Sequence, residues 1–354
     1  MKGLILSGGA GTRLRPLTYT GAKQLVPVAN KPVLFYAIED LVTSGIADIG
    51  LIVGDTAEQI KNAVGDGARF GAHVTYIRQE RPAGLAHAVG TARAFLGHDR
   101  FVMYLGDNFI REGIAPLVQA FERSAANACI MLYRVPDPSN LGVAVLDGDR
   151  VVRLVEKPRE HVSDLAIVGV YMFDHHIFAA VDSIKPSARG ELEITDAIQW
   201  LIDHGYHVQP HLLEGCWIDT GKMEDMLEAN RLVLEGMQPL MRGTVDECSQ
   251  LAGLVVVQDG AEIQNSILRG PLIIGARTRV SDSYVGPFTA IDHDCVLESV
   301  EIANSIVLEH SRIIDIEHRI EDSLIGRYAQ VHRSPVKPRA YKLLLGDHSK
   351  VVVL

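Results

Sequence analysis

The sequence of 354 residues has no run of about 18 apolar residues, so it predicts no membrane-spanning helix. It also has no cluster of basic residues. Its 34 Lys and Arg are outnumbered by 44 Asp and Glu, and the formal net charge of −10 argues against a nucleic-acid-binding surface. The apolar run at its start is too short for a signal peptide. A protein with this net negative charge could bind a polyphosphate only where local cations or metal ions offset the repulsion.

Cysteine is scarce, and no two cysteines lie close together in the sequence. The spacing therefore does not suggest a metal knuckle or a redox pair built on neighbouring thiols. Four cysteines could form two disulfides, but the length and class favour reduced, mostly buried thiols in a cytoplasmic protein. The four are Cys129, Cys216, Cys248 and Cys295.

Fourteen histidines are present, but their spacing does not predict a metal site. His204, His207 and His211 are three and four residues apart, yet the intervening glycine and proline break any helix that would present them on one face. The pair His175-His176 is typical of the start of a helix.

The length suggests two domains. Residues 1–240 alternate short apolar runs with helical patterns, which predicts a Rossmann-like, mostly parallel sheet covered by helices on both faces. Strands are expected at 3–6, 49–53, 74–77, 101–105 and 129–133, helices at 33–44, 57–64, 85–96 and 114–123, and irregular extra strands at 143–146, 151–155 and 169–173. Thr220 is the expected N-cap of a last helix that runs to about Glu235 and is followed by Gly236 as its stop.

From about residue 245 the helical periodicity disappears, and pairs of aliphatic residues recur six apart. This degraded hexapeptide pattern predicts a parallel β-helix over residues 241–354, and a plain β-rich domain is the alternative. The pairs are Val257 and Ile263, Ile274 and Val280, Val285 and Ile291, Val300 and Ile306, and Ile325 and Val331.

A glycine-rich loop follows the first expected strand. Its glycines let backbone N–H groups approach phosphate oxygens closely, and Arg13 adds a forked cation. The spacing is neither that of a P-loop nor that of a dinucleotide fingerprint, so a structural turn is an equally good interpretation of the loop alone. The expected nucleotide contacts are Leu6, at the end of that strand, and five loop residues: Gly8, Gly9, Gly11, Thr12 and Arg13.

The longer pattern is more specific. From Gly8 the chain reads Gly-Gly-x-Gly-Thr-Arg-Leu, then Pro-x-Thr, and from Lys23 it reads Lys-Gln-Leu-x-Pro-Val-x-x-Lys-Pro. This resembles the opening motif of the sugar-1-phosphate nucleotidylyltransferases, and the Lys-Gln-Leu form resembles the thymidylyl-transferring members. The C-terminal repeat resembles the left-handed β-helix of the longer members, so the likeness covers nearly the whole chain. Further matching segments contain Gln79, Asp107, Glu156, Arg189 and Trp217.

The resemblance implies attack of glucose 1-phosphate on the α-phosphorus of dTTP, which gives dTDP-glucose and pyrophosphate. A phosphate monoester has a second pKa of about 6, so the nucleophile is already an anion and needs no general base. Catalysis should therefore consist of positioning and charge neutralisation.

Two aspartates are the expected ligands of one Mg²⁺. Asp107 follows an expected strand, at the edge where open parallel sheets bind ligands, and Asp219 lies in a second such turn. Carboxylate oxygens are the ligands that this hard ion prefers. Either aspartate alone could equally be a helix cap or a turn residue.

The remaining roles follow from the matched motifs. Lys23 is assigned to the α-phosphate, Arg13 to the departing pyrophosphate, and Lys157 and Arg189 to the sugar phosphate. Gln24, Gln79 and Gly84 complete the expected nucleotide contacts. The two glutamines suit a base because a side-chain amide offers both a donor and an acceptor. The remaining sugar-phosphate contacts are Gly142, Glu156, Val168 and Glu193.

Alternatives stay open. Leu141 stands where relatives commonly carry an aromatic residue, which leaves the sugar less certain, and a UTP-using relative differs by one methyl group and a 2′-hydroxyl. A non-catalytic nucleotide-sugar-binding regulator would be expected to lack Lys23, Asp107 or Asp219. An acyltransferase acting through the β-helix would need a longer, more regular repeat. We expect the β-helix to serve in assembly of a homo-oligomer or in regulation, and a second nucleotide site for feedback control stays open.

Overall fold

The computed structural model describes residues 1–9, 11–334, 341 and 343–352, which form two compact units. The first unit comprises Met1–Ala10, Ala22–Leu25 and Val33–Asp219, and the second comprises Gly11–Gly21, Val26–Pro32 and Thr220–Leu354. Two short segments of the glycine-rich motif thus group with the C-terminal part of the chain. The division into domains 1–240 and 241–354 remains a prediction.

The first unit is built on a nine-stranded sheet with the order β10-β9-β11-β6-β1-β4-β5, in which β8 also pairs with β11 and β12 pairs with β8. The pairings set seven strands in one direction and only β10 and β11 in the other, so the predicted mostly parallel sheet is confirmed. The strands are β1 (Lys2–Leu6), β4 (Asp48–Val53), β5 (His73–Arg78), β6 (Phe101–Leu105), β8 (Ala128–Arg134), β9 (Gly142–Asp147), β10 (Arg150–Glu156), β11 (Leu165–Phe173) and β12 (Val208–Leu212).

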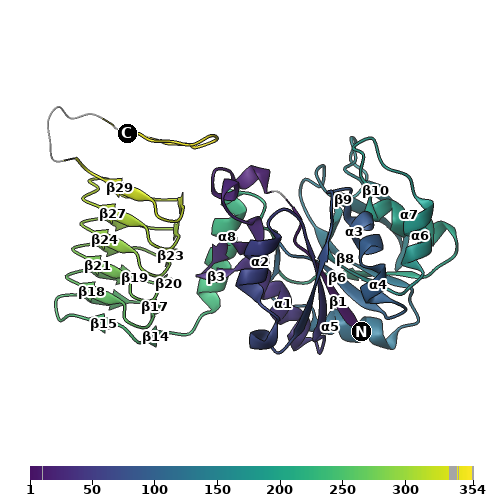
Figure 1. Cartoon of the computed structure of the whole chain (residues 1–354), viewed down its shortest axis with the longest axis horizontal. Coiled ribbons are helices and arrows are strands. Elements are labelled where there is room, and N and C mark those ends of the chain that lie inside the picture. Colours follow the sequence, from purple (N-terminus) through teal and green to yellow (C-terminus); the bar gives the residue numbers. More distant parts are fainter. Residues whose placement is uncertain (10, 335–340, 342, 353–354) are drawn as a thin grey trace. The chain divides into compact units, whose positions relative to one another are not determined.

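Helices cover both faces of this sheet (Figure 1). One core cluster joins the sheet to α1, α2 and α5, and a second joins it to α3, α4, α6 and α7. The helices are α1 (Val33–Thr43), α2 (Ala57–Val64), α3 (Leu85–Thr91), α4 (Arg93–Leu96), α5 (Ala115–Arg123), α6 (Ile177–Ser183) and α7 (Ile194–Asp203). Short 3-10 turns lie at Thr12–Leu14, Leu17–Tyr19, Lys23–Leu25 and Ala68–Phe70.

Two helix predictions need correction. The helix expected at 85–96 is interrupted at Ala92, which separates α3 from α4. Helix α8 (Met223–Gly236) has Lys222 rather than Thr220 at its N-cap, because the backbone of Lys222 is still extended. Its last helical residue is Gly236, which was predicted to follow the helix.

Two small antiparallel ribbons complete the catalytic half of the sequence. In the first unit, β7 (Asn108–Ile110) pairs with β13 (Trp217–Asp219). In the second unit, β2 (Pro27–Val28) pairs with β3 (Lys31–Pro32). Neither ribbon was predicted from the sequence.

Residues 240–332 of the second unit form the predicted left-handed parallel β-helix, whose coils stack three parallel sheets (Figure 1). The first sheet contains β14 (Leu240–Met241), β17 (Val255–Val257), β20 (Leu272–Ile274), β23 (Thr289–Ile291), β26 (Ile306–Val307) and β28 (Leu324–Ile325). The second contains β15 (Thr244–Val245), β18 (Glu262–Gln264), β21 (Arg279–Ser281), β24 (Val296–Glu298), β27 (Arg312–Ile314) and β29 (Gln330–His332). The third contains β16 (Gln250–Ala252), β19 (Ile267–Arg269), β22 (Tyr284–Val285) and β25 (Glu301–Ile302).

The strand register aligns one aliphatic residue of each coil in a column inside the β-helix. This column consists of Val257, Ile274, Ile291, Val307 and Ile325. Ile306, one of the aliphatic residues that recur six apart in the sequence, does not point into this column, because Val307 occupies that position and neighbouring side chains on a strand face opposite ways. Among the described residues, no helix combines the length and apolar character needed to cross a bilayer.

Candidate active site

Lys23 lies between two carboxylates in the first unit. Its ammonium is 2.5 Å from Asp107 Oδ2 and 3.6 Å from Asp219 Oδ1. The lysine side chain is only 7% exposed, so the three charges interact in a partly desolvated environment, where electrostatic forces are stronger than in water. The structure thus brings together the three residues on which the predicted chemistry chiefly depends.

The two aspartates meet because of the small ribbon beside the main sheet. Asp107 follows β6, and the next residue, Asn108, begins β7. Strand β13 pairs with β7 so that Asp219 stands opposite Asn108. A three-residue pairing between distant segments therefore carries the second carboxylate to the first.

Asn108 fixes the orientation of Asp107, a role that the sequence did not reveal. Its Nδ2 donates to Asp107 Oδ1 at 3.0 Å. Its Oδ1 accepts from the Gly169 N–H at 3.2 Å and from Trp217 Nε1 at 2.5 Å. A side chain at residue 169 would lie 2.4 Å from Asn108 Oδ1, which explains a glycine in the middle of β11. The only sequence signals were this mid-strand glycine and the presence of Asn108 beside a motif aspartate.

Two glutamines line the first part of the glycine-rich loop. A Cβ on Gly9 would lie 3.7 Å from Gln24 Nε2, and a Cβ on Gly8 would lie 3.4 Å from Gln79 Oε1. Gln24 is almost completely buried. Leu6 is the last residue of β1 and is also buried, so only its backbone is available to a ligand.

Gln79 is held by its amide nitrogen, which lies 2.8 Å from His87 Nδ1 and 3.4 Å from the Gly84 carbonyl oxygen. Gly84 has a φ of +102°, and a Cβ there would lie only 2.3 Å from the carbonyl oxygen of Leu192. Glycine is therefore required at this position. The close approach lets the backbone of Ala83 and Ala86 hydrogen-bond to Leu192, shortly before α7.

The later loop residues belong to the second unit. Gly11 has a φ of +61°, and its carbonyl oxygen accepts a 2.7 Å hydrogen bond from Thr18 Oγ1. Thr12 and Arg13 are exposed. The Arg13 guanidinium lies against Gly221, where a Cβ would be 2.7 Å from Nη2.

A second group of charged residues in the first unit contains most of the expected sugar contacts. Arg189 Nη2 donates to Glu156 Oε1 at 3.1 Å and to Glu193 Oε2 at 2.9 Å, and its Nε donates to Glu193 Oε1 at 3.3 Å. Ser187 and Thr195 add hydroxyl hydrogen bonds to Glu193 and Glu156. The glutamates are thus fixed in position by one shared cation.

This group lies at the sheet edge that also carries Asp107. Strand β11 pairs with β6 through Val170 and with β9 through Ala166, so β9 begins just beyond the end of β6. Gly142 is the first residue of β9, and a Cβ there would lie 2.7 Å from Thr195 Cγ2. Both halves of the predicted site therefore lie at one edge.

The other expected sugar-phosphate contacts differ in exposure. Lys157 directly follows β10 and is exposed, with its backbone N–H bonded to the Leu141 carbonyl oxygen. Val168 is completely buried in the hydrophobic core, so its side chain cannot touch a ligand that binds from solvent. Any contribution of Val168 to binding must come through its backbone.

Burial raises the pKa of Glu156 above its ordinary value, and the negative charge of Glu193 raises it further. The nearby Arg189 and Lys157 oppose this shift. A carboxyl group that costs free energy to ionise gains from any ligand that donates hydrogen bonds to its charged form, as sugar hydroxyls do.

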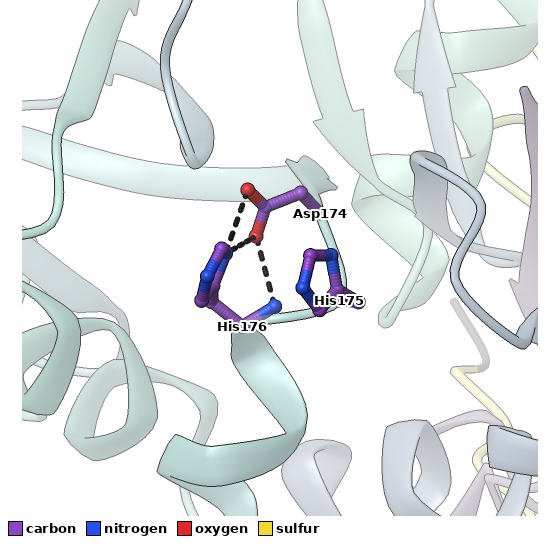
Figure 2. Close-up of side chains that lie close together, drawn as sticks. All are labelled: Asp174, His175 and His176. Carbon is purple, nitrogen blue, oxygen red and sulfur yellow. Dashed lines mark hydrogen bonds and ion pairs between the residues drawn. The ribbon is translucent and has the colours of Figure 1, made fainter.

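Among the described residues, two clusters of three side chains could offer ligand atoms to a metal ion: one contains Asp174, His175 and His176, and the other His293, Asp294 and His310. In the first group, Asp174 accepts from the backbone N–H and the Nδ1 of His176 (Figure 2). Asn127 Nδ2 donates to its second oxygen at 2.8 Å. These bonds hold the start of α6, as expected for a histidine pair before a helix.

Comparisons with known proteins agree with this geometry. A family model described as nucleotidyl transferase matches residues 2–236. The chain is 55% identical to glucose-1-phosphate thymidylyltransferase of Streptomyces griseus over 354 residues (100% of this chain, 99% of the relative). It is 47% identical to the low-salt glycan biosynthesis nucleotidyltransferase Agl11 of Haloferax volcanii over 356 residues (99% of each).

A solved structure from Bacillus anthracis, provisionally assigned as a glucose-1-phosphate thymidylyltransferase and bound to sucrose, is also similar. It is 36% identical with a TM-score of 0.63, and the likeness covers 68% of this chain and 98% of that one. Because the family model spans more than half of the residues and full-length relatives align from end to end, the chain belongs to the nucleotidyl transferase family, which confirms the predicted sugar nucleotidylyltransferase.

Proposed function

We propose that this protein transfers a thymidylyl group from dTTP to glucose 1-phosphate and releases pyrophosphate. The observation that carries the proposal is a largely buried lysine held between two carboxylates at the edge of a mostly parallel sheet. The choice of dTTP and glucose 1-phosphate rests on similarity to full-length relatives from Streptomyces griseus and Streptomyces antibioticus that are named for this activity.

Sugar nucleotidyltransferases are generally metal-dependent, and we propose that Asp107 and Asp219 hold Mg²⁺. The donor set fits, because both groups are carboxylates and both lie within 4 Å of one cationic atom, Lys23 Nζ. When bound, the ion would neutralise charge on the phosphates. The Asn108 amide keeps one oxygen of Asp107 in a fixed direction.

The chain's own residues position the reactants. An oxygen of the sugar phosphate attacks the α-phosphorus, the bond to the bridging β-phosphate oxygen breaks, and pyrophosphate departs with that electron pair. Lys23 donates to the α-phosphate as negative charge spreads over its oxygens. Backbone N–H groups of the glycine-rich loop and Arg13 bind the departing phosphates in this proposal.

Gln79 is suited to read the base. Its amide nitrogen is occupied by His87 and Gly84, so its oxygen, beside Gly8, remains to accept the N3–H of a pyrimidine. Gln24 adds a second amide near Gly9.

Glu156 and Glu193 accept from sugar hydroxyls in this proposal, with Gly142 leaving room for the ring. The hydrogen bonds from Arg189 to these glutamates use Nε and Nη2, which leaves the two Nη1 donors for the sugar phosphate beside Lys157.

We also infer a cytoplasmic homo-oligomer. Reduced thiols support the compartment, and stacked coils that bury aliphatic side chains support assembly through the β-helix.

Pyrophosphate release tests the proposal directly. The purified chain is incubated with Mg²⁺, each of dTTP, UTP, ATP, CTP and GTP, and the 1-phosphates of glucose, galactose, mannose and N-acetylglucosamine. The expected result is fastest release with dTTP and glucose 1-phosphate. Faster release with UTP would overturn the nucleotide assignment, and no release with any pair would overturn the proposal.

A further inference from the structure

The turn between β2 and β3 has an unfavourable backbone. Val28 pairs with Lys31, which leaves Ala29 and Asn30 as a two-residue loop, and their φ angles are +48° and +61°. Two positive values define a type I′ turn, which normally takes Asn-Gly or Asp-Gly. Alanine is poorly suited to the first position, because its Cβ crowds the backbone in the left-handed region. Such a turn persists only where its surroundings hold it.

Asn230 supplies that support. It lies on α8, is completely buried, and its Oδ1 accepts from the Ala29 N–H at 2.9 Å. Its Nδ2 donates to the Phe288 carbonyl oxygen at 2.8 Å, and Asn30 Nδ2 donates to the Ile291 carbonyl oxygen at 2.7 Å. The turn is thus tied to the β-helix directly through Asn30 and indirectly through Ala29, whose N–H bonds to Asn230.

Apolar contacts reinforce these bonds. Ala29 packs in one cluster with Leu234 of α8 and with the outward-facing Val256, Ile273 and Ala290 of three successive coils. This cluster is separate from the interior column of the β-helix. The face formed by β17, β20 and β23 therefore serves as a platform for α8 and the turn.

The turn lies close in sequence to the catalytic lysine. The lysine lies in the segment Ala22–Leu25, which groups with the first unit. The segments on either side of it, Gly11–Gly21 and Val26–Pro32, both group with the β-helix. At the preceding segment, a Cβ on Gly21 would lie 3.2 Å from Arg327 Nη1, and a Cβ on Gly326 would lie 2.9 Å from Leu17 Cδ2. The four residues that include Lys23 and Gln24 are therefore anchored at both ends to parts of the second unit.

We propose that Asn230 is a positioning residue for nucleotidyl transfer: by holding the Ala29-Asn30 turn on the β-helix, it sets the position of the segment that carries Lys23. This inference rests on the proposed function, because it takes Lys23 and Gln24 to contact the nucleotide. It assigns the β-helix a part in catalysis besides assembly.

The test compares Asn230→Ala with the double variant Ala29→Gly/Asn230→Ala. We expect Asn230→Ala to lower kcat/KM for dTTP about tenfold, with a raised KM for dTTP and an unchanged KM for glucose 1-phosphate. Glycine adopts positive φ without strain, so the double variant should recover most of this loss, whereas Ala29→Gly alone should behave as wild type.

Ser305→Ala is the matched control. Ser305 is buried in the β-helix, and its hydroxyl bonds only to the Ala303 carbonyl oxygen and the Ser323 N–H among the described residues, so Ser305→Ala removes a similar buried side-chain hydrogen bond and none that reaches the turn. It should lower the melting temperature while leaving both KM values unchanged. If Asn230→Ala proves insoluble, Asn30→Ala removes the other side-chain bond and should give the same shift in KM for dTTP.

An active wild-type enzyme separates this inference from the proposed function. If wild type turns over dTTP and glucose 1-phosphate but Asn230→Ala changes kcat/KM by less than twofold, the positioning role is refuted. Equal rises in both KM values, or no recovery with Ala29→Gly, would refute it too. Inactive wild type would count against the proposed function instead.

Discussion

Replacing Asn108 by alanine should affect both stability and turnover. The asparagine side chain is about 2% exposed and makes three hydrogen bonds. Truncation would leave the Gly169 N–H and the Trp217 indole N–H without their acceptor in the interior. Each buried donor left unpaired costs about 1–3 kcal/mol, so the free energy of unfolding should fall by about 3 kcal/mol. Turnover should fall as well, because Asp107 loses the donor that orients it.

A double-mutant cycle with Trp217→Phe isolates the main hydrogen bond. Phenylalanine keeps an aromatic ring but has no indole N–H, so the double variant contains no unpaired indole donor. It should be more stable than the sum of the two single losses by about 1–2 kcal/mol, as measured by urea unfolding. Additivity within about 0.5 kcal/mol would refute a stabilising Asn108–Trp217 bond. Wild-type kcat in Asn108→Ala would refute its part in orienting Asp107.

Three further predictions follow from individual contacts. Asp107→Asn keeps the side-chain shape but loses the charge, so pyrophosphate release should fall at least ~10³-fold, about 4 kcal/mol, with little change in melting temperature; a near-normal rate would contradict its role. Gly142→Ala would place a Cβ 2.7 Å from Thr195 Cγ2, so KM for glucose 1-phosphate should rise while KM for dTTP stays constant, and a rise in both would contradict separate subsites. Exposed Cys248 should be alkylated by iodoacetamide at pH 8 before Cys129, because burial raises the pKa of Cys129 to about 12; mass spectrometry that finds Cys129 labelled first would contradict this.

Local patterns predicted the regular elements well. The expected helix at 57–64 and the strand at 101–105 match α2 and β6 at both ends, because the helix has a clear apolar period and the strand is a short apolar run between polar residues and glycine. The predicted helix at 85–96 has continuous helical spacing, and nothing in that spacing indicates the break at Ala92. The β7–β13 ribbon was also invisible, since its three-residue strands carry no periodic signal and lie more than 100 residues apart.

Site residues could be predicted from the sequence when their own chemistry decides their role. They were missed when the role depends on hydrogen-bond partners that lie far away in the sequence. Lys23, Asp107 and Asp219 were named from their motifs, and the structure brings them together. The role of Asn108 depends on Gly169 and Trp217, which lie 61 and 109 residues away in sequence. Such a role can be recognised only when the fold shows which distant groups share one buried amide.

The glycine-rich motif is divided between the two compact units, which its sequence does not predict. As a pattern it is one continuous segment, yet its pieces alternate between the two compact units. The residues expected to bind the sugar phosphate, by contrast, all belong to the first unit. In the proposed positioning role of Asn230, a change confined to the β-helix reaches the segments expected to bind the nucleotide through the chain that it anchors, whereas the group expected to bind the sugar is held by contacts within its own sheet. If Asn230 has the proposed role, this asymmetry gives the C-terminal part of the chain a physical route to alter the use of nucleotide while leaving affinity for the sugar phosphate unchanged.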